Sequence, residues 1–110
     1  MYRVTKTLEI SAAHKLDLSY ESKCSNLHGH NWLLHITCES ETLNKDGMVY
    51  DFTHIKKKIH DALDHKYLND ILGVNPTAEN IAKWICEQIG QTCKRVVVQE
   101  SEGNVAEYEV

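Results

Sequence analysis

Residues 2–10 read Tyr-Arg-Val-Thr-Lys-Thr-Leu-Glu-Ile, and apolar and polar side chains alternate along most of this stretch. The apolar residues that share one face are Tyr2, Val4, Leu8 and Ile10. Alternation with a period of two predicts a β-strand with one buried face, and Lys6 is the only residue that departs from it.

The same pattern predicts three further strands. Residues 30–39 place Trp32, Leu34, Ile36 and Cys38 on one face. Residues 95–100 hold a β-branched valine run, and a turn at Gly103-Asn104 leads into a last strand over 105–109. Residues 15–27 are polar and irregular, so we expect a loop between the first two strands.

Two helices are predicted between the strand pairs. The first follows a proposed N-cap at Thr53, and the second starts at Pro76-Thr77 and ends at Gly90. Their apolar stripes, at helical spacing, are Ile55, Ile59, Ala62 and Leu63 in the first and Ala78, Ile81, Ala82, Ile85 and Ile89 in the second. The order ββααββ predicts an α+β fold, with an antiparallel four-stranded sheet and two helices on one face. Such an open sheet has two unpaired edges, which pairing with other subunits would cover.

Length and composition restrict the class of protein. The chain has 110 residues, which suits one domain over residues 1–110. A formal net charge of −4 argues against a nucleic-acid partner. No apolar stretch approaches the roughly 20 residues of a transmembrane helix, and the N-terminus resembles no signal peptide. We therefore expect no membrane partner, a cytoplasmic location and reduced cysteines.

Seven histidines are an unusual number for this length. His28 and His30 lie two residues apart, so their rings point the same way on an extended strand. His14 keeps the parity of the first strand's apolar face and is the best third ligand. Three imidazoles with an open fourth position describe a catalytic zinc site, although a lone His-x-His also occurs by chance. The histidines assigned to solvated surface are His35, His54 and His60.

Cys24, four residues before His28, is open to two interpretations. It could be a fourth ligand that closes a structural zinc site, or a free thiol acting as base or nucleophile. Asp64 and His65 could form a proton relay with it, or His65 could simply favour a helix C-terminus. The other cysteines, Cys38, Cys86 and Cys93, are predicted to be small apolar fillers or incidental thiols, the last of them in a loop.

Glu100 ends the valine-rich strand. A carboxylate there is usually only exposed. If it faces a pocket, it could accept two hydrogen bonds from the amino-imino edge of a pterin or guanine.

Taken together, these residues resemble the 6-pyruvoyl-tetrahydropterin synthase family, closest to its bacterial 6-carboxy-5,6,7,8-tetrahydropterin synthase branch. Six segments in the family's order carry the resemblance over nearly the whole chain. They are Ser11–His14, Cys24–Asn31 (with three residues between the cysteine and His28, as in the bacterial branch), Val49–Phe52, Leu63–Asn69, Asn75–Asn80 and Val98–Ser101.

The resemblance implies a tunnelling fold (T-fold), in which trimers close a twelve-stranded barrel, two trimers stack into a homohexamer, and active sites lie between subunits. By matching position, the zinc ligands would be His14, His28 and His30, and the catalytic residues would be Cys24 as general base with Asp64 and His65 as its relay. Glu100 would anchor the pterin, with Thr77 and Glu79 contributed by a neighbouring subunit. Lys15 is expected to help bind a triphosphate.

The implied reaction converts 7,8-dihydroneopterin triphosphate to 6-carboxy-5,6,7,8-tetrahydropterin in queuosine (7-deazaguanine) biosynthesis, releasing acetaldehyde and triphosphate. A 6-pyruvoyl-tetrahydropterin synthase, which eliminates triphosphate but keeps the side chain, is the alternative. A non-catalytic structural zinc module and a zinc-hydroxide hydrolase are further alternatives; the hydrolase leaves Cys24, Asp64, His65 and Glu100 without a role.

Overall fold

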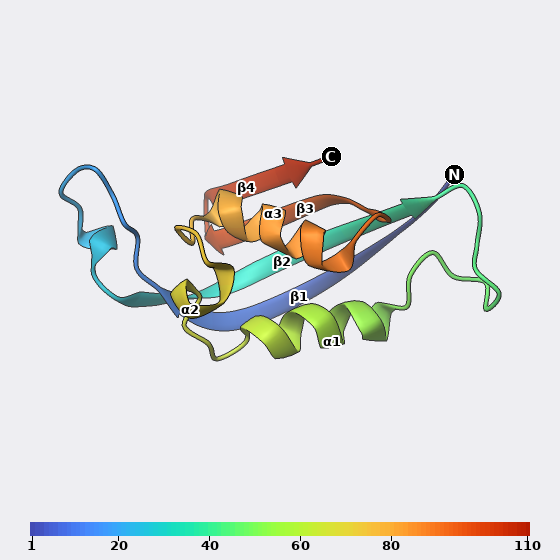
Figure 1. Ribbon diagram of the computed structural model, residues 1–110, viewed down its shortest axis with the longest axis horizontal. Helices are drawn as coiled ribbons and strands as arrows, with labels where there is room; N and C mark the ends of the chain where they lie inside the picture. The colour runs from blue at the N-terminus through green and yellow to red at the C-terminus, as the bar shows by residue number, and fades with distance from the viewer.

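The structure, a computed structural model of residues 1–110, is one antiparallel sheet with helices on one face (Figure 1). The strands, hydrogen-bonded in chain order, are β1 (Tyr2–His14), β2 (His28–Ser40), β3 (Cys93–Ser101) and β4 (Asn104–Glu109). The helices are α1 (Phe52–Leu63), α2 (Asn69–Leu72) and α3 (Ala78–Ile89). The predicted α+β class and four-stranded antiparallel sheet are confirmed, and the structure adds a short third helix, α2.

The strands extend beyond their predicted ends. β1 and β2 pair from Tyr2↔Ser40 to His14↔His28, so both reach the histidines. Backbone pairing continues there although the stripe of large apolar side chains ends at Ile10 in β1 and begins at Trp32 in β2. β3 begins at Cys93, which pairs with Cys38 and is 1% exposed. The predicted loop position of Cys93 was therefore wrong, whereas its burial fits a small apolar filler.

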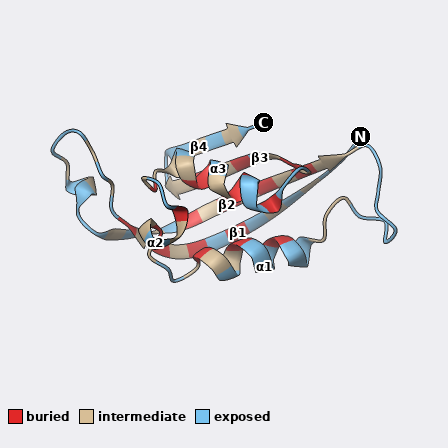
Figure 2. Cartoon of the chain, in the orientation of Figure 1, coloured by how far each residue is buried: buried red, intermediate tan, exposed pale blue.

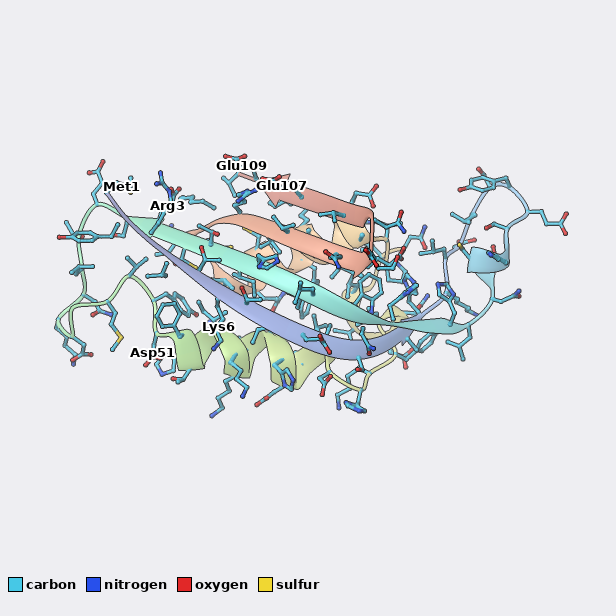
Figure 3. The ribbon with its side chains drawn as sticks, turned by 180° about the vertical axis from the view of Figure 1, so that it is seen from behind. Met1, Arg3, Lys6, Asp51, Glu107 and Glu109 are labelled. Atoms are coloured by element: carbon cyan, nitrogen blue, oxygen red, sulfur yellow. The ribbon has the colours of Figure 1, made fainter.

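The two faces of the sheet differ in polarity. One face packs against the helices, and a core of 20 buried residues lies between them (Figure 2). Trp32 and Leu34 are completely buried there, as the alternation predicts. The helix-free face carries cross-strand polar pairs instead (Figure 3). These pairs are Arg3–Glu39, Thr5–Thr37, Thr7–His35 and Arg95–Glu107.

The helix starts follow local capping chemistry. Asp51, not Thr53, is the N-cap of α1, because its carboxylate accepts the Thr53 N–H at 2.8 Å. The prediction of Thr53 was wrong by two residues because both side chains belong to capping types. Thr77 caps α3 as predicted, accepting the Asn80 N–H at 3.1 Å, and Gly90 ends that helix with φ 103°.

The segment after α1 is attached to the end of β1. The His65 N–H donates to the Ser11 carbonyl at 2.6 Å, and Ala13 forms a parallel bridge with Tyr67. This attachment holds Asp64 and His65 beside the last residues of β1. No helix is long and apolar enough to cross a membrane.

Candidate metal centre and active site

Three histidines meet at the end of the sheet. The ligand nitrogens of His14, His28 and His30 all lie within 4.8 Å of one another. His14 and His28 are directly paired across β1 and β2, and His30 follows on the same face. Strand parity therefore brings together the residues that the sequence selected, and the cluster could hold a metal ion.

The second nitrogen of two of the rings is already bound. His14 Nδ1 lies 2.8 Å from the Pro76 carbonyl, and His28 Nδ1 lies 2.7 Å from the Asn26 carbonyl. Since a carbonyl oxygen only accepts, each Nδ1 carries the proton and donates, which leaves each Nε2 with a free lone pair. These bonds fix both the ring orientation and the tautomer that a metal ligand needs.

Two ring nitrogens without a hydrogen-bond partner indicate that the cluster could bind a metal. His14 Nε2 and His30 Nε2 are buried and have no hydrogen-bond partner. Leaving such a group unsatisfied costs stability, so the site is incomplete as a purely protein environment. Burial lowers the pKa of His14, which keeps its ring in the neutral, metal-binding form. The residues present therefore fit a divalent metal ion.

Glu100 stands beside this cluster. Its Oε1 lies 3.5 Å from His14 Nε2 and 3.6 Å from His30 Nε2, which is longer than a good hydrogen bond. Glu100 also lines a hollow of about 380 Å³ together with Glu79, between α3 and β4. The two carboxylates thus share a cavity of one chain, whereas the resemblance implied that Glu79 reaches it from a neighbour. The Thr77 hydroxyl is already used in capping α3.

Asp64 and His65 form the predicted contact although they are adjacent in sequence. His65 Nδ1 donates to Asp64 Oδ2 at 2.7 Å, and Asp64 Oδ1 accepts the Ser11 N–H at 2.9 Å. His65 adopts φ 58°, an uncommon conformation for a residue other than glycine, just after the end of α1. The Ser11 N–H, and then His65, lower the pKa of Asp64 and keep it ionised.

Sequence reasoning missed His60. It was assigned to solvated surface, but it is half-buried and its Nε2 lies 3.7 Å from Asp64 Oδ2. The i,i+4 spacing of His60 and Asp64 on α1 is the signal that could have identified it.

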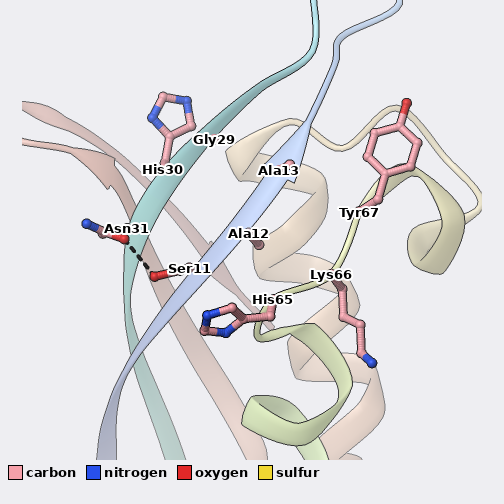
Figure 4. Close-up of a pocket in the computed structure, with 9 residues that line it drawn as sticks. All are labelled: Ser11, Ala12, Ala13, Gly29, His30, Asn31, His65, Lys66 and Tyr67. Carbon is pink, nitrogen blue, oxygen red and sulfur yellow. Dashed lines mark hydrogen bonds between the residues drawn. The ribbon is translucent and has the colours of Figure 1, made fainter.

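His65 faces solvent. The His65 side chain is 80% exposed and borders a hollow of about 570 Å³. Figure 4 shows His30 projecting from β2 and His65 from the segment after α1, with Ser11 bonded to Asn31 between them. One residue of the histidine cluster, His30, and one of the Asp64–His65 pair, His65, thus border a common opening.

Cys24 lies apart from both groups. It occupies a 3-10 turn, Lys23–Ser25, and its thiol is not among the clustered ligand atoms. No hydrogen bond joins that thiol to His65. The single chain therefore provides three clustered imidazoles but no hydrogen bond between Cys24 and His65. Lys15, next to His14, has an exposed side chain.

A helix-covered antiparallel sheet defines an α+β protein of the tunnelling-fold class, and the three-histidine cluster at its end could bind a metal. The chain belongs to the 6-pyruvoyl tetrahydropterin synthase family, whose sequence profile matches residues 3–110. Members of this family are metal-dependent enzymes of the lyase type, so this chain is an enzyme of that class.

Proteins similar to this chain are named for different activities. A 6-carboxy-5,6,7,8-tetrahydropterin synthase of Synechocystis is 39% identical over 94 residues, which cover 77% of this chain and 72% of that protein. A dihydroneopterin monophosphate aldolase of Pyrococcus furiosus is 39% identical over 90 residues, or 79% and 74% of the two chains. The 6-pyruvoyl tetrahydropterin synthase structure from Caenorhabditis elegans superposes with a TM-score of 0.78 at 26% identity, covering 99% of this chain and 95% of the other.

Proposed function

We propose that this enzyme converts 7,8-dihydroneopterin triphosphate to 6-carboxy-5,6,7,8-tetrahydropterin, with release of acetaldehyde and triphosphate, as a step of queuosine biosynthesis. The observation that carries the proposal is the pair of buried, unpartnered Nε2 atoms of His14 and His30 beside the Glu100 carboxylate. These nitrogens could bind a metal ion, and the neighbouring carboxylate would suit a pterin edge. The 6-carboxy name of the Synechocystis relative supports this branch.

The metal is proposed to be zinc, held by His14, His28 and His30. Three neutral imidazoles with an open position are the ligand set of catalytic zinc. When bound, zinc supplies Lewis acidity to the substrate's side-chain oxygens. The clustered atoms include no thiol, which favours this arrangement over a closed four-ligand structural site.

The chain's own residues would divide the remaining work. Glu100 anchors the pterin through its amino-imino edge, with Glu79 on the wall of the same hollow. Cys24, as thiolate, removes a carbon-bound proton. His65, oriented by Asp64, exchanges protons with the reacting side chain and with solvent. Lys15 and Thr77 remain proposed contributors to substrate binding.

The proposed relay would draw on a second subunit, because no hydrogen bond joins Cys24 to His65 within one chain. The free edges of β1 and β4 suit pairing between copies, and the polar helix-free face suits a water-filled interior. We place the enzyme in a homohexamer of two stacked barrel-shaped trimers. The four free cysteines suit a reducing, cytoplasmic compartment.

Product analysis tests the proposal. Zinc-loaded protein is incubated with dihydroneopterin triphosphate, and acetaldehyde is measured against triphosphate. Equal amounts of both support the 6-carboxy activity. Triphosphate without acetaldehyde indicates the 6-pyruvoyl activity, which is the second candidate because the similar Caenorhabditis elegans protein is a 6-pyruvoyl tetrahydropterin synthase. In a parallel incubation with dihydroneopterin monophosphate, turnover of that substrate alone indicates an aldolase. No turnover of either substrate with zinc bound indicates a structural zinc module.

A further inference from the structure

Two asparagine side chains form hydrogen bonds with the backbone at the start of the loop that carries Cys24. The Lys15 N–H donates to Asn69 Oδ1 at 3.0 Å, and Asn69 Nδ2 donates to the Lys15 carbonyl at 2.8 Å. Asn75 binds Asp17 in the same way, at 2.9 Å and 3.0 Å. Each amide therefore satisfies both backbone groups of one residue, as a neighbouring strand would.

Leu16, which lies between Lys15 and Asp17, is hydrogen-bonded to Cys24. The Leu16 N–H donates to the Cys24 carbonyl at 3.0 Å, and the Cys24 N–H donates to Ser22 Oγ at 3.1 Å. The asparagines fix Lys15 and Asp17, and so they also fix the direction of the Leu16 N–H. The position of Cys24 therefore depends on Asn69 and Asn75 through one intervening residue.

Apolar burial holds this loop less firmly than it holds the strands. Leu16 and Leu18 are half-buried, but none of the 20 buried residues of the core falls within residues 15–27. A loop without buried apolar side chains keeps one conformation only where its backbone groups are bonded. The two asparagines supply four of these bonds.

The same stretch of chain also orients a metal ligand. Pro76, the residue after Asn75, provides the carbonyl that accepts the His14 Nδ1–H. His14 immediately precedes Lys15, the first residue that the asparagines bind. Residues 69–76 thus position both a ring of the histidine cluster and the Cys24 loop, which ties the thiol's location to that of the cluster.

We infer that Asn69 and Asn75 are positioning residues for Cys24, which hold its thiol at a fixed place relative to the histidine cluster. The importance of that placement for turnover rests on the proposed function. The placement itself does not, because it can be followed without any pterin substrate.

The test uses Asn69→Ala and Asn75→Ala in zinc-loaded protein. The matched control is Asn44→Ala, since Asn44 Oδ1 also binds backbone, accepting the Asp46 and Met48 N–H groups at 2.9 Å and 3.0 Å in a distant loop. The rate at which iodoacetamide alkylates Cys24 is measured by mass spectrometry across pH. The buried Cys38, Cys86 and Cys93 serve as internal references. Amide exchange of residues 15–27 is followed in parallel.

We expect amide exchange over residues 15–27 to accelerate and the alkylation rate of Cys24 to change about tenfold in both alanine variants, and neither to change in the control. With substrate, kcat should fall about 10- to 100-fold while KM and zinc content stay near those of the parent, since small misplacements of a reacting group cost this much. Asn69→Asp and Asn75→Asp keep the acceptor and lose the donor, so their alkylation, exchange and kcat should be intermediate.

Unchanged exchange and alkylation in the variants overturn the inference, as does faster exchange with kcat preserved in an active enzyme. If the parent turns over no pterin, the proposed function fails, while the exchange and alkylation measurements still decide whether the asparagines place Cys24. If an alanine variant does not fold, the aspartate variants decide by the same criteria.

Discussion

The histidine cluster and the Asp64–His65 pair use the same side chain in opposite surroundings. In the cluster, His14 is fully buried and its Nδ1 donates to a neutral carbonyl. In the pair, His65 is 80% exposed and its Nδ1 donates to a carboxylate. A carbonyl partner in a buried site fixes a neutral ligand ring, whereas a carboxylate partner in contact with water suits a ring that takes and releases protons. The partner of Nδ1 and the burial of the ring together distinguish a ring suited to bind a metal from a ring suited to exchange protons.

The largest expected effect comes from His28→Ala. It removes one of three clustered imidazoles, so bound metal and turnover should both be lost. Metal per chain, measured after gel filtration, checks this. His35→Ala is the control, because His35 bonds only Thr7 on the helix-free face and should keep its metal. Stoichiometric metal in the His28 variant would exclude a three-histidine site.

The relay pair should respond differently to Asp64→Asn. The amide oxygen can still accept the Ser11 N–H, but the amide nitrogen then faces the His65 N–H and the ring loses its orientation. We expect kcat to fall about 10²- to 10⁴-fold, the usual contribution of general acid–base catalysis, while the metal stays bound. Steady-state kinetics and metal analysis on one preparation test this. Loss of metal would show that the two regions are not separable.

The same substitution has a smaller effect on stability, and the effect depends on pH. The folded-state pKa of Asp64 is lowered by the Ser11 N–H and by His65, so its contribution to stability is present above the unfolded-state value of about 4. It is lost as the pH falls through the lower folded-state pKa. The difference in Tm between parent and Asp64→Asn should therefore be present at neutral pH and shrink below about pH 4. A difference that grows on acidification would contradict this sign.

The smallest effect should come from His60→Gln. His60 lies 3.7 Å from Asp64 and is the last of the causes that lower the Asp64 pKa. Its removal should change kcat by about twofold, the size of an i,i+4 helix pair, and move the acid limb of the pH–rate profile slightly upward. A pH–rate profile of both proteins provides the measurement. A change as large as that of Asp64→Asn would make His60 part of the relay.

The sequence predicted what depends on local periodicity. Alternation identified the strands and put His14 on the buried face, and His-x-His spacing put two rings on one side. What it missed depends on contacts between distant residues. The asparagine bonds to Lys15 and Asp17 join residues 54 and 58 positions apart, and no pattern within one segment indicates them.

The sequence pattern also does not decide between neighbouring residues of similar chemistry, and it does not reveal very short helices. Asp51 and Thr53 both suit a helix cap, and Asp51 takes the position through its extended backbone and its carboxylate bond to the Thr53 N–H. The four-residue helix α2 has too few turns to show a periodic stripe.

The pairing of His14 with His28 has a consequence for how the chain folds. These residues are opposite each other at the last step of the β1–β2 pairing, where the loop of residues 15–27 begins and ends. An ion bound by both would act as a reversible crosslink at the base of that loop and would offset part of the entropy lost on closing it. With a metal bound, pairing of the long β1–β2 hairpin could therefore start at its loop end. Pairing of β2 with β3, which is more distant in sequence, would follow.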